Sequence, residues 1–200
     1  MEEQIKNTLE DKNTGDNLSV GVQLIVGLQG NYDIIYADPP WRYNFSLDNN
    51  DKIENHYPTM SIDELKAMKV PASKDCILFL WATAPKLKEA IELIEAWGFE
   101  YKTHAIWDKK WIGMGYWFRG RHELLMVATK GKVSPPDRKQ IIESIFDIKR
   151  GEHSKKPPFI REKINEWYPT KTKLELFARK PNELFTESDF AGWHVWGNQC

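Results

Sequence analysis

Cysteine is scarce in this sequence of 200 residues, which contains only Cys76 and Cys200. Two cysteines so far apart make neither a disulfide framework nor a zinc cluster. Cys76 stands in an apolar run and is expected to be a small buried hydrophobic residue. We therefore predict a protein with reduced cysteines and no metal site.

Long apolar segments are also missing. No run approaches the roughly 20 residues that a membrane span requires, and the acidic start lacks the basic and apolar regions of a secretory signal. These absences predict a cytoplasmic protein without membrane association. Residues 18–200 are expected to form one domain behind a flexible N-terminal arm, residues 1–17. Within the domain, residues 18–28 fit either an edge strand or a short helix.

The formal net charge is only −1, but the charges are divided unevenly along the chain. Residues 1–100 carry a net charge of −8 and residues 101–200 a net charge of +7. A basic C-terminal half is a candidate surface for a polyanion such as nucleic acid. The alternative is that an acidic face and a basic face merely compensate each other within one domain.

The sequence is organised around Asp38-Pro39-Pro40-Trp41. The preceding run, residues 32–37, is short and rich in β-branched and aromatic residues, which predicts a buried strand ending before Asp38. Ligands of open α/β sheets bind at the carboxyl ends of the strands. The prolines keep this end extended, so we expect the Asp38 carboxylate and the backbone carbonyls to be bare hydrogen-bond acceptors, beside Trp41 as a flat apolar wall.

Such a set of groups suits an amino group attached to an aromatic ring. Two acceptors that bind the two amine hydrogens draw the nitrogen towards a reactive geometry, and an aromatic side chain stacked on the ring holds it in place. The alternative is a strand followed by a proline turn, with Trp41 packed in the core.

The rest of the chain alternates between helix and strand patterns. Ser61 and Glu64 form a capping box that predicts the start of a helix, and apolar spacing predicts helices at residues 85–97 and 159–167. Short apolar runs predict strands at residues 75–81, 99–107, 123–129, 145–149, 173–179 and 192–199. This alternation predicts an α/β fold, a three-layer sandwich with a mostly parallel sheet flanked by helices.

Basic residues gather in two loops. Residues 108–122 interleave glycines, aromatic residues and positive charges, a composition that fits a loop gripping nucleic acid by stacking and phosphate contact. The candidate substrate-binding residues in this loop are Lys109, Lys110, Arg119, Arg121 and His122. The alternative is an aromatic core loop with incidental basic residues. In the second loop, Lys155 and Lys156 precede a predicted helix N-terminus, a position that suits an anion.

Seven sequence blocks follow one another in a specific order. They are Asp38-Pro39-Pro40-Trp41, Tyr57-Pro58-Thr59-Met60, Leu78-Phe79-Leu80-Trp81, Gly115-Tyr116-Trp117-Phe118 with Arg121-His122-Glu123, His153-Ser154-Lys155-Lys156-Pro157, Glu175-Leu176-Phe177-Ala178-Arg179 and Gly197-Asn198-Gln199. Together they resemble the MT-A70 family of adenine-N6 methyltransferases, in its compact bacterial or phage form, over about residues 32–199. The resemblance implies a Rossmann-like class I methyltransferase fold and S-adenosylmethionine as cofactor.

The resemblance also implies roles for individual residues. Asp38 and Pro39 would hold the target amine in a catalytic motif that Pro40 and Trp41 complete, and Asp38 would also lie near the methionine end of the cofactor. The residues implied to wall the adenine pocket are Trp41, Tyr57 and Trp81. The residues implied to bind the cofactor are Lys156, Phe177, Arg179, Asn182, Asn198 and Gln199, with a substrate phosphate as the alternative ligand of Lys156.

Two features depart from the family pattern. Family members often have a histidine and an asparagine shortly after the arginine that corresponds to Arg179, and here only Asn182 can match. The insert at residues 183–191 is longer than expected for a compact member.

The predicted activity is transfer of a methyl group from S-adenosylmethionine to the N6 amine of adenine in nucleic acid. DNA is favoured because the chain is compact and has no additional RNA-binding module. The alternatives are an RNA adenosine methyltransferase, a non-catalytic nucleic-acid-binding subunit of the same fold, and a methyltransferase of small free amines. Loops at 42–56, 108–122 and 131–140 are expected to read a short or relaxed recognition sequence, and the sequence leaves monomer and homodimer undecided.

Overall fold

The computed structural model describes residues 30–43, 58–149, 151, 156–178 and 190–197. The strands of this part of the chain form one sheet in the order β5-β3-β4-β2-β1-β6-β7. These strands are β1 (Tyr32–Ala37), β2 (Ala72–Ala82), β3 (Glu100–Asp108), β4 (His122–Lys130), β5 (Ile145–Asp147), β6 (Lys173–Leu176) and β7 (His194–Trp196). The predicted arm at residues 1–17 and the segment 18–28 lie outside the described residues.

The sheet is mostly parallel, as the alternation of helix and strand patterns predicts. β1 pairs in parallel with β2 and β6, β6 with β7, and β3 with β5. Among the described strands only β4 runs in the opposite direction, and it lies between β2 and β3. The first residues of β4 therefore reach the same sheet edge as the last residues of β1, β2 and β3.

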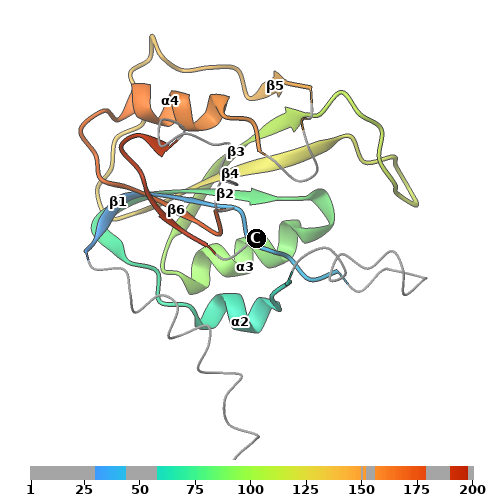
Figure 1. Cartoon of the computed structure of the whole chain (residues 1–200), viewed down its shortest axis with the longest axis horizontal. Helices are drawn as coiled ribbons and strands as arrows, with labels where there is room; N and C mark the ends of the chain where they lie inside the picture. The colour runs from blue at the N-terminus through green and yellow to red at the C-terminus, as the bar shows by residue number, and fades with distance from the viewer. Residues whose placement is uncertain (1–29, 44–57, 150, 152–155, 179–189, 198–200) are drawn as a thin grey trace, which may run out of the picture.

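Helices cover both faces of this sheet. They are α2 (Ile62–Ala67), the short 3-10 turn η3 (Ala84–Lys86), α3 (Leu87–Ala96) and α4 (Phe159–Trp167). In Figure 1, α2 and α3 lie below the sheet and α4 lies above it. The predicted three-layer α/β sandwich is confirmed in the described residues.

Strand β1 shows how alternation builds the two layers. Ile35 and Ala37 belong to the apolar cluster between the sheet and helices α2 and α3. Ile34 and Tyr36 belong to the cluster between the sheet and helix α4. Successive side chains of a strand point to opposite faces. Because both faces are covered by helices, the strand is apolar at nearly every position, as parallel central strands usually are.

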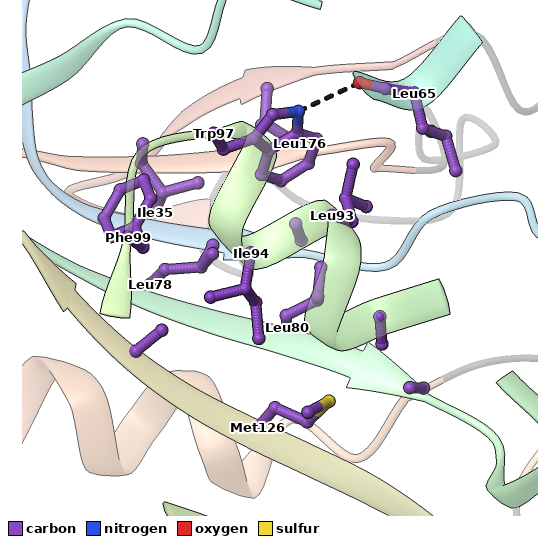
Figure 2. Packing of buried hydrophobic residues seen from close by; sticks show 14 of the residues in the cluster. Ile35, Leu65, Leu78, Leu80, Leu93, Ile94, Trp97, Phe99, Met126 and Leu176 are labelled. Atoms are coloured by element: carbon purple, nitrogen blue, oxygen red, sulfur yellow. Dashed lines mark hydrogen bonds between the residues drawn. The ribbon is translucent and has the colours of Figure 1, made fainter. Parts of the chain in front are cut away.

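Helix α2 and the end of helix α3 are held together by a hydrogen bond as well as by apolar packing. The Trp97 indole N–H donates to the Leu65 carbonyl at the end of α2, at 2.9 Å, and both residues lie among buried side chains (Figure 2). The predicted capping box is confirmed at the start of α2, where Glu64 accepts from the Ser61 backbone N–H and the Ser61 hydroxyl accepts from the Glu64 backbone N–H. These bonds satisfy backbone groups that a helix end leaves without partners.

Several predicted boundaries shift. The strand expected at 75–81 spans residues 72–82, and the strand expected at 145–149 is shortened to three residues. The strand expected at 173–179 ends at Leu176, because Phe177 has a φ of 63°, which takes the backbone into the left-handed region and out of the strand.

Within the described residues, no helix is long and apolar enough to cross a membrane. Likewise, no group of three or more histidine, cysteine, aspartate or glutamate side chains is placed to hold a metal ion there.

We predict that Leu93→Ala lowers the free energy of unfolding by about 2–5 kcal/mol, because it leaves a cavity under α3. Leu93 has no exposed surface. On the same helix Leu87 is 38% exposed, so Leu87→Ala should change stability by no more than about 0.5 kcal/mol. Urea unfolding of the two variants measures the difference, and equal losses would contradict the assigned core.

Candidate active site

The Asp38 turn lies at the carboxyl end of β1, in the middle of the sheet. Ala37 pairs with Leu176 on one side and with Leu80 on the other, so the turn is flanked by the ends of β6 and β2. Asp38 is partly buried and the two prolines that follow are buried. The predicted position of the aspartate at the carboxyl end of the strand is confirmed.

The prediction that the Asp38 carboxylate and the proline carbonyls are bare acceptors is wrong. Asp38 accepts from Lys156 at 2.7 Å, the Pro39 carbonyl accepts from the Trp41 N–H, and the Pro40 carbonyl accepts from the Met60 N–H, both at 2.8 Å. The Met60 bond holds the turn against the segment that precedes α2. A carbonyl oxygen has two lone pairs, so the Pro39 carbonyl keeps the capacity to accept one further hydrogen bond.

Both tryptophans near the turn are buried. Trp41 is 6% exposed, packs in the cluster under α2 and α3, and donates its indole N–H to the Trp81 carbonyl at 3.2 Å. Trp81 has no exposed surface, and its indole N–H donates to the Tyr36 hydroxyl at 2.7 Å. Neither indole presents an open face in this structure: Trp41 packs on the side of α2 and α3, and Trp81 packs on the side of α4.

A buried lysine connects this turn to the strand β4. The Lys156 Nζ lies 2.7 Å from Asp38 Oδ2 and 3.3 Å from Glu123 Oε2. It also lies 5.7 Å from the centroid of a Trp81 ring. The side chains of Lys156 and Glu123 are each 14% exposed, so the three charges interact in an environment with little water, where electrostatic interactions are strong.

Glu123 binds a second lysine as well. Lys109 Nζ lies 3.2 Å from Glu123 Oε1, so one carboxylate bridges the loop before β4 and the loop before α4. Glu123 belongs to one of the seven sequence blocks, but no role was predicted for it. The signal was a carboxylate at the start of an apolar strand, directly after a basic loop.

The pKa values of this cluster favour the charged forms. Burial lowers the pKa of Lys156, but the negative charges of Asp38 and Glu123 outweigh it and raise the pKa well above its usual value. Burial raises the pKa of Glu123, but Lys156 and Lys109 outweigh it and lower the pKa. Lys156 therefore stays protonated at neutral pH and cannot act as a base, whereas it can hold an anion or orient a carboxylate.

The predicted basic loop is engaged within the protein. Arg121 donates two hydrogen bonds to the Asp108 carboxylate, at 2.7 and 2.6 Å, and holds the pKa of that carboxyl below its usual range. Lys110 pairs with Asp108 and Asp147, at 3.3 and 2.9 Å. With Lys109 on Glu123, three of the five predicted substrate ligands make internal ion pairs, whereas Arg119 and His122 are exposed.

The predicted cofactor residues are only partly described. Phe177 follows β6 directly beside the Asp38 turn, is 5% exposed, and contacts Trp196 at a ring-centroid distance of 5.6 Å. Its left-handed backbone is costly for a residue with a side chain and is typical of a functional constraint. Tyr57, Arg179, Asn182, Asn198 and Gln199 lie outside the described residues and stay predictions.

Gly197 marks a close approach at the same edge. A Cβ at Gly197 would lie 2.1 Å from the Ala178 carbonyl oxygen, and the Ala178 N–H donates to the Trp196 carbonyl at 3.1 Å. Only glycine fits here without a backbone shift. The segment that leads to the predicted cofactor residues Asn198 and Gln199 therefore packs closely against the residues after β6, beside Asp38.

A cavity of about 600 Å³ lies elsewhere, at the amino ends of β1 and β6, where Tyr32, Lys173 and His194 contribute to its lining. Ligands of open α/β sheets bind at the carboxyl ends of the strands. The Asp38 edge, with its buried charges, is therefore the better candidate for chemistry.

We predict that Glu123→Gln lowers the free energy of unfolding at neutral pH by about 1–3 kcal/mol, because it removes the negative charge shared by two lysines. The pKa of Glu123 is lowered from 4.5 in the folded protein. Its stabilisation is therefore present above pH 4.5 and is lost as the pH falls through the folded-state pKa. Urea unfolding at a series of pH values should show the gap between the two proteins closing in acid.

Glu143→Gln serves as the matched control, because Glu143 is exposed. Its stability should follow that of the unchanged protein at every pH. A gap between Glu123→Gln and the unchanged protein that is the same in acid as at neutral pH would contradict the ion-pair assignment.

Comparison with known proteins identifies the family of the chain. The MT-A70 family profile matches residues 32–199. A type II methyltransferase, M.MunI from Mycoplasma sp, is 37% identical over 186 residues, which cover 83% of this chain and 76% of that protein.

More distant similarity extends to larger proteins. A probable N(6)-adenosine-methyltransferase, MT-A70-like, from Oryza sativa subsp. japonica is 31% identical over 85% of this chain and 23% of its own length. The N(6)-adenosine-methyltransferase catalytic subunit METTL3 of Homo sapiens is 27% identical over 88% of this chain and 29% of its own length. The chain thus spans about a quarter of these two relatives and about three quarters of the bacterial one.

Proposed function

This chain belongs to the MT-A70 family, and from that premise we propose that it transfers a methyl group from S-adenosylmethionine to the N6 amine of adenine in DNA. The observation that carries the proposal is the Asp38 carboxylate, which stands at the carboxyl end of a central strand and is bound by a buried ammonium group. The family and the N(6)-adenosine-methyltransferases among the relatives support methyl transfer to an adenine amine.

The turn offers two acceptors for the amine. One is the Asp38 carboxylate, which accepts about four hydrogen bonds and so can bind an amine as well as Lys156. The other is the second lone pair of the Pro39 carbonyl. The lone pair of an adenine amine is delocalised into the ring, and two acceptors on its hydrogens draw the nitrogen towards a tetrahedral geometry with a localised lone pair.

Charge at the turn favours the transition state over the ground state. Positive charge develops on the amine nitrogen as it forms a new bond, and the Asp38 carboxylate is fixed in place to stabilise that charge. Glu123 supports this arrangement, because it gives Lys156 a second carboxylate to bind while Asp38 binds the amine.

The described residues fit the methionine end of the cofactor. An α-amino acid group carries an ammonium and a carboxylate, and Asp38 and Lys156 present the complementary charges 2.7 Å apart. When bound, S-adenosylmethionine supplies a methyl group on a sulfonium centre that is already electrophilic. Asp38, Lys156 and Phe177 would hold it, with Arg179, Asn182, Asn198 and Gln199 as further predicted ligands.

One comparison favours DNA as the polymer. The chain matches three quarters of a type II methyltransferase of similar size, at 37% identity, and it matches only about a quarter of the N(6)-adenosine-methyltransferases, at 31% and 27% identity. RNA is the second candidate, and the named adenosine methyltransferases among its relatives favour it.

We predict that Asp38→Ala lowers methyl transfer to adenine-containing DNA by about 100-fold or more, because it removes the acceptor for the charged nitrogen. Incorporation of label from radioactive S-adenosylmethionine measures the effect. Near-normal transfer by this variant would contradict the proposed role.

Asp33→Ala is the matched control for Asp38→Ala. Asp33 lies near the other end of β1, where its carboxylate accepts from the Thr172 N–H at 3.2 Å. This variant should transfer methyl groups at the rate of the unchanged protein. Circular dichroism of both variants separates a lost fold from a lost acceptor.

A further inference from the structure

A hairpin arm leaves the sheet between β3 and β4, and its tip is apolar and exposed. Figure 1 shows the arm at the right-hand edge, reaching beyond the body of the protein. We call residues 112–118 the hairpin tip. Its large side chains are Ile112 (68% exposed), Met114 (87%), Tyr116 (83%), Trp117 (94%) and Phe118 (88%).

Backbone bonds and glycines give the arm a defined shape. The Lys109 N–H donates to the Arg121 carbonyl at 3.0 Å, and the Gly113 N–H donates to the Gly120 carbonyl at 2.7 Å. A Cβ on Gly115 would lie 2.0 Å from the Phe118 carbonyl oxygen, so the turn at the tip accepts only glycine there. The aromatic side chains are therefore presented on an ordered backbone.

Charge along the arm is arranged in two zones. At the base, Lys109, Lys110 and Arg121 are engaged with acidic side chains. The tip has no charged residue between Ile112 and Phe118, and Arg119 stands directly after it. The arm therefore offers an apolar tip with one neighbouring positive charge, Arg119, rather than a cluster of lysines and arginines for binding phosphates.

The arm stands at the active-site edge. β4 begins at His122, at the sheet edge where β1 ends in Asp38. A series of ion pairs connects the base of the arm with the site: Lys109 pairs with Glu123, Glu123 with Lys156, and Lys156 with Asp38. Trp117 stands four residues before Arg121 at the base of the arm, which corresponds to a reach of roughly 13 Å.

We propose that the hairpin tip inserts an aromatic side chain, foremost Trp117, into the base stack of a DNA duplex beside the target adenine. This inference rests on the proposed function. An adenine amine cannot reach Asp38 while the base is stacked and paired, so the base must leave the duplex. An inserted aromatic ring fills the space the base leaves, and Arg119 is placed to contact the neighbouring phosphate.

A nucleic acid fits the tip better than a protein partner does. Three of the seven tip residues are aromatic, and aromatic rings stack on any base. The tip also shares its edge of the sheet with the site to which the base must be delivered. Large exposed apolar patches mark interaction sites, and here the neighbouring arginine matches the charge of a phosphate backbone.

The test compares Trp117→Ala with the unchanged protein on a duplex and on one of its strands. A stacked base contributes about 1–3 kcal/mol, so methyl transfer to the duplex should fall about tenfold. Transfer to the single strand should stay within about twofold, because no base has to leave a stack. Ile141→Ala, which changes an exposed apolar residue outside the arm, should leave both rates unchanged.

A second readout does not depend on chemistry. Insertion unwinds DNA, so a plasmid relaxed by a topoisomerase in the presence of the Asp38→Ala protein should show a shifted linking number. Adding Trp117→Ala should remove that shift. The two proposals can fail separately. A shifted linking number with the Asp38→Ala protein, together with no methylation of any polymer by the unchanged protein, would support the insertion and contradict the proposed function.

Three results would overturn the insertion. One is an equal loss of duplex and single-strand transfer in Trp117→Ala, and another is an unchanged linking number with either protein. The third is a change of sedimentation coefficient from dimer to monomer in Trp117→Ala, which would show that the tip covers a second copy of the chain.

Discussion

The site depends on one buried ammonium group between two carboxylates. Lys156 lies within 3.3 Å of both Asp38 and Glu123, and burying three charges is costly unless they compensate each other. Lys109 also binds Glu123, so the two lysines compensate the two carboxylates. Asp38 is the carboxylate of this cluster that stands at the turn, and it has the capacity to accept further hydrogen bonds.

The same interaction joins parts of the chain that serve different purposes. Asp38 belongs to the turn after β1, Lys156 to the segment before α4, and Glu123 to the start of strand β4, directly after the hairpin arm. Glu123 also binds Lys109 at the base of the arm. Glu123 and Lys156 therefore connect the arm, for which we propose a role in DNA binding, with Asp38, for which we propose a role in catalysis.

Local patterns predicted much of this structure. β1, its proline stop and the capping box at Ser61 follow from neighbouring residues, and each was placed correctly. The antiparallel direction of β4 was not predictable, since a short apolar run carries no information about its direction. The contact between Asp38 and Lys156 joins residues 118 positions apart, and the internal pairing of Arg121 with Asp108 depends on the register of β3 against β4. Such features arise only when the sheet has formed.

The most direct measurement is methyl transfer from labelled S-adenosylmethionine to double-stranded DNA, single-stranded DNA and RNA of mixed sequence, followed by nucleoside analysis. We expect label in N6-methyladenine, with DNA preferred over RNA. We also expect transfer to weaken as the salt concentration rises, because contacts to phosphates release counterions. Bound cofactor without label in any of the three polymers would contradict the proposed function.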